Sequence, residues 1–187
     1  SYGFKNGVSN YSYDLNGNMI SDSGKGITSI DYNHLNLPQS IAIDGSTIAY
    51  QYAADGTKLK KTASGNTTEY SGATVYKDGN LELIHTPEGY IEPVGEDDYR
   101  YVYRLKDHLG NTRVSFTKNQ TTNEIDVLQI NDYYPFGLLH DKPVNQNVAN
   151  SSNIGEAFKF NGKERDPDLG WDDFGARMFM PDTGRWG

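Results

Sequence analysis

The chain has 187 residues, a formal net charge of −8 and no cysteine. Nucleic-acid binding needs clustered Lys or Arg, and the 17 basic residues of this chain are scattered, which excludes a nucleic-acid partner. The absence of cysteine excludes disulfides and thiolate chemistry, and no apolar run approaches the roughly 18 residues that a membrane-spanning helix requires.

Aromatic residues dominate the apolar part of the composition. Only 35% of the residues are hydrophobic, and this share includes 14 Tyr beside 7 Phe and 2 Trp. One aromatic ring removes on the order of 150–250 Å² from water, and a Tyr hydroxyl can stay hydrated while its ring is buried. We therefore expect a shallow core of rings stacked along sheets.

The first half of the chain contains a repeat. Three similar segments align on Tyr13, Tyr32 and Tyr52, which are 19 and 20 residues apart. Each segment is typical of a strand, a turn built from Asp, Asn and Gly, and a return strand. Two strands in about 20 residues cannot bury an apolar face alone, so neighbouring units must pair. Residues 1–85 are therefore predicted to form a β-repeat array.

Two dipeptides, Asp44-Gly45 and Asp78-Gly79, mark further hairpins within the array. Asp-Gly adopts the tight turns that join antiparallel strands. The strands predicted beside these turns, and after the repeated Tyr residues, are 19–20, 37–43, 47–50, 59–62, 75–76 and 81–84.

The densest basic group in the chain also lies in this half. It consists of Lys58, Lys60 and Lys61, and no aromatic residues are interleaved with them in the way that favours nucleic-acid binding. We interpret the three lysines as a solvated strand face.

A connection is predicted at residues 86–98, which contain two Pro and two Gly and end in three acidic residues. We expect it to include one short strand near Tyr90. Residues 99–187 then form a second unit, continuous with the array.

The sharpest hairpin of the second unit spans residues 101–116. Every second residue from Tyr101 to Leu105 is large and apolar, which is the period of a half-buried strand. Gly110 and Asn111 tolerate positive φ at low cost, and they are predicted to form the reversal.

The rest of the chain is predicted to contain strands, turns and one loop. Residues 124–131 alternate as a strand, and the turn after them uses Pro135 to fix φ and Gly137 to adopt the left-handed region. Residues 141–155 are rich in Asn and Ser, without periodicity, and are predicted to be a mobile loop. The longest helical candidate, 171–178, is short and contains a Gly. We therefore expect an all-β protein in which consecutive antiparallel hairpins form an elongated, curved sheet with little helix.

Two motifs could carry chemistry, and each has a structural interpretation. Asp182-Thr-Gly resembles the catalytic loop of aspartic peptidases, but it occurs once and lacks the preceding apolar residues, so 181–184 is predicted to be a turn. The four histidines lack metal-ligand spacing, and His108 is interpreted as a packed or hydrogen-bonded turn residue.

Charged residues gather in the C-terminal motifs. Two neighbouring aspartates there could form a carboxylate pair, but adjacent residues of an extended segment point apart. We instead predict an Arg–Asp network that holds these motifs together. Its members are Arg165, Asp166, Asp172, Asp173 and Arg177. The sequence thus predicts no catalytic residue, no metal site and no cofactor.

Four motifs occur together in the second unit. They are Lys-Asp-His-Leu-Gly-Asn-Thr-Arg at 106–113, Asp-Tyr-Tyr-Pro-Phe-Gly at 132–137, Phe-Lys-Phe-Asn-Gly-Lys-Glu at 158–164 and Phe-Gly-Ala-Arg-Met-Phe-Met-Pro-Asp-Thr-Gly-Arg-Trp at 174–186. This combination closely resembles the Rhs repeat-associated core of the Rhs/YD-repeat proteins, in a Bacteroidetes-like form. Residues 1–90 resemble the family through looser Tyr-Asp repeats. One departure is Met180, which precedes Pro181 where the family usually has Asp.

The resemblance implies a structural role for the motif residues. They are Tyr101, Tyr103, Asp107, His108, Gly110, Arg113, Tyr134, Pro135, Gly137, Gly162, Gly175, Arg177, Pro181, Gly184, Arg185 and Trp186.

The resemblance also implies a function. In this family the repeats wind into a hollow β-spiral that encloses a variable C-terminal payload, as in polymorphic toxins, and the core closes one end. The partners are then the rest of the shell and the payload, and the location is secreted or at the bacterial cell surface, including the cell wall. In some relatives an aspartyl autoprotease, built from residues beyond the Gly-Arg-Trp motif, releases the payload. We therefore expect no enzyme activity and no self-cleavage here.

A binding module is the alternative. Sheet faces rich in Tyr and Trp, together with Asn-rich loops, could bind carbohydrate or a protein at the cell surface. The rings occupy strand-alternation positions, which favours a core role instead. An open sheet edge is also a template for pairing with another chain, and we expect edge-strand self-association, as in a dimer.

Overall fold

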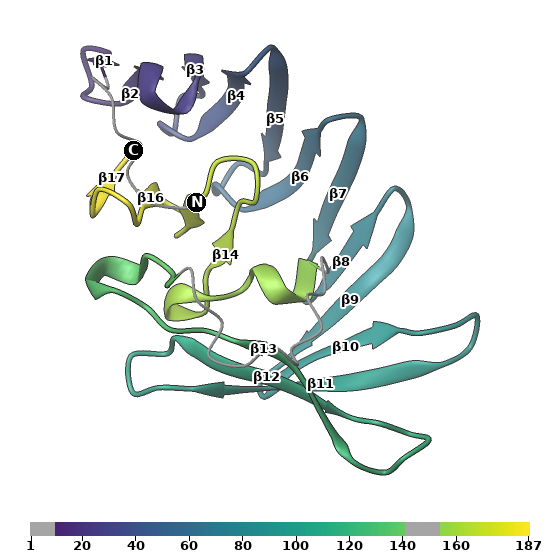
Figure 1. Ribbon diagram of the computed structural model, residues 1–187. Helices are drawn as coiled ribbons and strands as arrows, with labels where there is room; N and C mark the ends of the chain where they lie inside the picture. The colour runs from purple at the N-terminus through teal and green to yellow at the C-terminus, as the bar shows by residue number, and fades with distance from the viewer. Residues whose placement is uncertain (1–9, 141–153) are drawn as a thin grey trace.

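The computed structural model describes residues 10–140 and 154–187, and its main element is a 13-stranded antiparallel sheet (Figure 1). The order of the strands in the sheet is their order in the sequence, so each strand pairs with the strands before and after it. The sheet curves around the C-terminal segment, which lies on its concave side (Figure 1). This architecture confirms the predicted all-β fold of consecutive hairpins. The strands are β1 (Tyr11–Tyr13), β2 (Met19–Asp22), β3 (Ile27–Tyr32), β4 (Pro38–Ile43), β5 (Ser46–Tyr52), β6 (Lys58–Ala63), β7 (Asn66–Ser71), β8 (Thr74–Lys77), β9 (Asn80–Thr86), β10 (Gly89–Pro93), β11 (Tyr99–Lys106), β12 (Thr112–Lys118) and β13 (Ile125–Ile130).

A second, four-stranded sheet forms within residues 154–187, named here the C-terminal segment. Helical structure in the described residues is limited to short 3₁₀ turns, and the helical candidate 171–178 contains strand residues instead. The elements are β14 (Glu164–Arg165), β15 (Asp172–Asp173), β16 (Met178–Met180), β17 (Arg185–Trp186), η1 (Ser23–Lys25), η2 (Pro135–Gly137), η3 (Ile154–Ala157) and η4 (Phe160–Gly162).

One five-residue turn recurs six times in the described residues. The backbone N–H of its first residue donates to the carbonyl of the fifth at 2.7–3.0 Å, and the N–H of the fourth donates to the carbonyl of the first at 2.9–3.2 Å. The fourth residue has a positive φ, which explains why Gly occupies five of the six positions and Asn the other. The turns are 14–18, 33–37, 53–57, 107–111, 134–138 and 159–163.

In three of these turns the side chain of the first residue, an Asp or an Asn, accepts two backbone N–H groups of the same turn. One carboxylate oxygen of Asp107 accepts the N–H groups of Leu109 and Asn111, both at 3.0 Å. Asp14 and Asn33 make the same pair of bonds in their own turns. The reversal after β11 therefore runs over 107–111, earlier than predicted.

Within that reversal only one of the two predicted residues has a positive φ. Gly110 has φ +82°, whereas the side chain of Asn111 is buried and joins two elements. Its amide donates to Asp107 at 2.9 Å, and its carbonyl oxygen accepts the N–H of Asn161 at 2.8 Å.

Two-residue turns with positive φ at both positions join three further hairpins. Asp44-Gly45 and Asp78-Gly79 have positive φ at both positions, as predicted from the dipeptides. Ser64-Gly65 forms a further turn of this type between β6 and β7.

A β-bulge follows four of the six turns, those that join β1 to β2, β3 to β4, β5 to β6 and β11 to β12. The extra residue lies six positions after the first residue of the turn, at Ile20, Gln39, Leu59 and Arg113. A bulge places the residue before it and the residue two positions after it on the same face. At all four bulges these two flanking residues point toward the concave side, where they are largely buried.

The position of the turn after β11 explains why the expected core role is wrong for the rings of Tyr101 and Tyr103. Tyr50 is 2% exposed and lies three residues before its turn, and Arg104 occupies that position before the turn at 107–111. Tyr101 and Tyr103 are therefore one residue out of step with the earlier motif, and they point outward with 57% and 43% of their surface exposed. The ring of Tyr103 stacks on that of Phe116, at 5.5 Å between centroids.

Two apolar clusters occupy the concave side. The larger one joins β2 to β5 with the C-terminal segment, which contributes Leu169, Trp171, Met178 and Met180. The smaller one lies on β8 to β13 and includes Tyr90. The core is thus aliphatic as well as aromatic, and the C-terminal segment supplies part of it.

The predicted connection 86–98 contains β10, which pairs with both β9 and β11, so the sheet continues through it. The strand predicted at 124–131 is β13, and the turn predicted around Pro135 is η2. The predicted mobile loop, 141–155, lies outside the described residues except for its last two positions.

The turn geometry predicts unequal effects of two substitutions in the same reversal. Gly110→Val forces a β-branched residue into the left-handed region and should destabilise the fold by about 2 kcal/mol. His108→Ala, at an exposed position, should change stability by less than about 0.5 kcal/mol. Urea unfolding measures both. The reverse order would point to a function for His108.

Candidate functional site

The concave face of the sheet is the candidate site, because it binds the C-terminal segment through ionisable side chains. Residues of the sheet between Lys25 and Arg104 contact residues of the segment that are far away in the sequence. These contacts fall into two groups, at β5 to β7 and at β9 to β11, and a separate ion pair joins Lys25 of η1 to Asp182.

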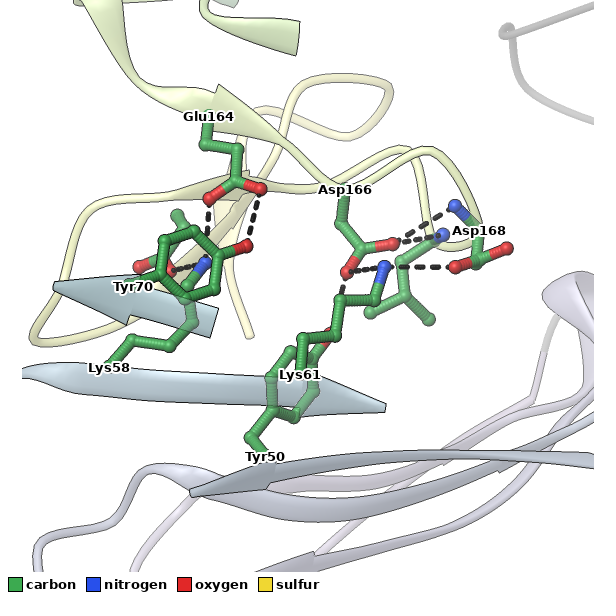
Figure 2. Close-up of polar contacts among 9 residues, drawn as sticks. Tyr50, Lys58, Lys61, Tyr70, Glu164, Asp166 and Asp168 are labelled. Carbon is green, nitrogen blue, oxygen red and sulfur yellow. Dashed lines mark hydrogen bonds and ion pairs between the residues drawn. The ribbon is translucent and has the colours of Figure 1, made fainter. Parts of the chain in front are cut away.

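The first group centres on Lys58 and Lys61, named here the lysine clamp (Figure 2). The ammonium nitrogen of Lys58 lies 2.8 Å from Glu164 and 2.7 Å from Asp173. The ammonium nitrogen of Lys61 lies 2.8 Å from Asp166 and 2.9 Å from Asp168. Each lysine therefore bridges two carboxylates of the C-terminal segment.

The predicted solvated face of three lysines is wrong for these two residues. The bulge at Leu59 turns Lys58 and Lys61 to the concave side, where their side chains are only 13% and 10% exposed. Lys60 remains on the outer face, 34% exposed, and pairs with Glu69 at 3.2 Å. Simple alternation cannot place both clamp lysines on one face, because they are three residues apart.

Two phenols complete the clamp. The hydroxyl of Tyr50 donates to Asp166 at 2.7 Å, and the hydroxyl of Tyr70 donates to Glu164 at 2.7 Å. Burial, followed by the neighbouring carboxylate, raises the pKa of both phenols, so they remain neutral donors. Burial alone would lower the pKa of Lys58, but the charges around it, led by Glu164, hold that pKa above its ordinary value.

The predicted Arg–Asp network is confirmed in one pair. Arg165 and Asp172 form a two-bond pair at 2.8–2.9 Å and are almost fully buried. Arg165 also donates to the carbonyl of Gly137 at 2.9 Å, which joins the segment to the turn at η2. Arg177 takes no part in this pair and lies 4.7 Å over the ring of Trp186.

The second group of contacts is named here the latch. It consists of His85, Tyr90 and Arg104 on the sheet, with Glu156 and Phe158 on the segment. The hydroxyl of Tyr90 donates to Glu156 at 2.7 Å, and the ring of His85 packs edge-on against Phe158 at 4.5 Å. The guanidinium of Arg104 lies over both aromatic rings, 4.7 Å from Tyr90 and 5.2 Å from Phe158.

Asp182 lies in a turn, as predicted, and binds a lysine. The N–H groups of Thr183 and Gly184 both donate to the carbonyl of Met180. The carboxylate of Asp182 lies 2.7 Å from the ammonium of Lys25 on the sheet. This arrangement anchors the end of the segment.

The other predicted motif residues lie in separate places. The recurring turns contain Asp107, His108, Gly110, Tyr134, Pro135, Gly137 and Gly162, and of these His108 and Tyr134 are exposed. Arg113 pairs with Asp132 at 2.5 Å. Gly175 and Gly184 have positive φ, and Arg185 and Trp186 form β17. These residues shape turns and edges, and the motif did not point to the clamp or the latch.

Within 10–140 and 154–187, no group of three His, Asp or Glu residues is arranged to bind a metal ion. In the same residues, no helix has the length and apolar character needed to cross a membrane.

No protein-family model and no curated protein sequence matches the chain. Solved structures do match. A TcdB2–TccC3 structure is 19% identical with a TM-score of 0.66, over 93% of this chain and 10% of that one. TcdB2–TccC3 without its hypervariable C-terminal region is 17% identical with a TM-score of 0.61, over 95% and 10%. A Tc holotoxin pore of Photorhabdus luminescens carrying TccC3-D651A is 18% identical with a TM-score of 0.65, over 93% and 9%.

These similarities establish the fold. The chain has the Rhs-like β-repeat fold that its motifs predict, and it spans about a tenth of the length of the proteins it matches.

The clamp predicts a large difference between two neighbouring lysines. Lys58→Met removes the cation that compensates two buried carboxylates, so we expect the free energy of unfolding to fall by about 3 kcal/mol. Lys60→Met removes an exposed pair and should change it by less than about 1 kcal/mol. Urea unfolding of both variants measures this contrast, and equal effects would contradict it.

Proposed function

We propose that the chain is a non-enzymatic structural module, part of an Rhs/YD-repeat shell that encloses or presents a variable C-terminal toxin domain. One observation carries this proposal. The 13 strands pair in strict sequence order, so repeats added beside β1 would lengthen the sheet without rearranging it.

The C-terminal segment supports the proposal by its position on the concave side. The lysine clamp, the latch and the Lys25–Asp182 pair attach it to strands from β6 to β11 and to η1. A segment fixed at both ends of a curved sheet acts as a brace and sets the curvature that a closed shell needs.

The similar structures add a second line of support. One of them is described as lacking a hypervariable C-terminal region, so in that protein a variable part accompanies the conserved one. We therefore assign this chain to a larger polymorphic toxin that is secreted or located at the bacterial cell surface. Its partners are the remaining shell and the payload.

Edge pairing belongs to the same proposal. Among the described residues, β1 and β13 each have a strand partner on one side only. The edge of β1 would receive upstream repeats, and either edge could pair with a second copy of the chain.

Protease protection in the parent protein tests enclosure. If the shell surrounds the payload, limited trypsin digestion should leave the payload domain intact in the folded parent and cut it after the shell is unfolded. The isolated payload domain serves as the control. Digestion of the payload at the same rate with and without its shell would contradict enclosure.

A binding module remains the second candidate, and one observation favours it. Tyr99, Tyr101 and Tyr103 follow each other along the outer face of β11 with 45%, 57% and 43% of their surface exposed. Exposed aromatic rings can stack on sugar rings or enter protein interfaces. A glycan array with wild-type chain and Tyr101→Ala separates the candidates, since a structural module gives no Tyr101-dependent binding at millimolar ligand.

A further inference from the structure

The latch differs from the clamp in how its titratable groups are paired. Both clamp lysines bridge carboxylates, and each ion pair is compensated. His85 has no such partner, because no carboxylate within 10–140 or 154–187 forms an ion pair with it. Its ring is partly buried and contacts Phe158 edge-on, at 4.5 Å and 76° between ring planes.

Cations surround the imidazole of His85. β10 contributes the neutral phenol of Tyr90, directly across from His85 in the strand pairing. β11 contributes Arg104, which lies on the same Phe158 ring, and Lys106. The segment contributes Glu156, whose carboxylate accepts the hydroxyl of Tyr90. A positive charge on the imidazole of His85 is therefore unfavourable.

We propose that His85 makes the latch sensitive to acid: protonation of its imidazole releases residues 154–160 from the sheet while the rest of the C-terminal segment stays docked. The group that titrates lies on β9, and the segment that responds begins at η3.

The direction of the effect follows from the charge environment. Burial, then Arg104 and Lys106, lowers the pKa of His85 in the closed latch to about 4, from an ordinary value of 6.5. The closed state is therefore fully favoured above pH 6.5 and loses stability as the pH falls toward 4. If His85 regains its ordinary pKa on opening, the closed-to-open ratio falls by up to about thirtyfold at pH 5.

The release is local because the two halves of the segment are held differently. Trp171 is 0% exposed, and Leu169, Met178 and Met180 are at most 5% exposed, in the apolar cluster with β2 to β5. Apolar burial does not titrate. Residues 154–160, in contrast, have fewer apolar contacts, from Ile154 to the smaller cluster and from Phe160 to Phe179 at 6.0 Å between ring centroids. They depend also on the latch, on the N–H of Thr112, which donates to the carbonyl of Lys159, and on Arg104, which donates to the carbonyl of Gly155.

Hydrogen exchange of the full chain tests the inference. Protection factors, corrected for intrinsic exchange, are compared between pH 7 and pH 5 for 154–160 and for 169–180. In the wild-type chain we expect protection of 154–160 to fall at least fivefold while that of 169–180 stays constant. In His85→Gln, which cannot be protonated, 154–160 should show no such fall. His108→Gln, an exposed histidine, should behave as the wild type.

Two outcomes would overturn the inference: equal pH profiles for the wild type and His85→Gln, or constant protection of 154–160 in the wild type. If His85→Gln does not fold, the imidazole resonances of His85 in the wild-type chain decide the matter. A titration midpoint near 4 that coincides with release of 154–160 supports the inference, and a midpoint near 6.5 with the segment still docked contradicts it.

Discussion

Two lysine side chains lie on the concave face of the sheet, where water cannot solvate them fully. Moving a charge out of water costs several kcal/mol, and only closely placed opposite charges offset that cost. Lys58 and Lys61 obtain these charges from Glu164, Asp166, Asp168 and Asp173, which all belong to the C-terminal segment. The sheet therefore depends on the segment for its stability. The segment depends on the sheet in turn, because within the described residues these four carboxylates form ion pairs with no cation other than the two lysines.

Much of the fold could be predicted because its turns are encoded locally. A Gly or Asn at the fourth position of a five-residue turn, or an Asp-Gly pair, is sufficient to locate a reversal. The tyrosine repeat then indicates the strands between the reversals. Strand order follows from the same information, since every pairing joins neighbours in the sequence. The latch and the clamp were beyond this approach, because their two sides lie 54 to 116 residues apart.

The faces on which the clamp lysines lie depend on a single bulge residue in their hairpin. A bulge such as that at Leu59 reverses the faces of all residues beyond it, so Lys58 and Lys61 share a face that Lys60 does not. The interpretation of all three lysines as one solvated face did not include this reversal. Aligning the hairpins on their turns places Lys58 and Lys61 on the concave face. Lys58 and Lys61 then coincide with Met19 and Asp22, which are both 1% exposed. The same alignment places Arg104 where Tyr50 lies, and Tyr101 then points to solvent.

The strict strand order also has a kinetic consequence. Each hairpin closes a short loop, and contacts between near neighbours in the sequence form rapidly. The ion pairs of Lys58 close loops of 106 and 115 residues, which carry a larger entropy cost. During synthesis the sheet can therefore form strand by strand, with Lys58 and Lys61 still hydrated. Desolvation of these ammonium groups is deferred until residues 164–173 have been synthesised, so the concave face closes only after its partner segment has emerged.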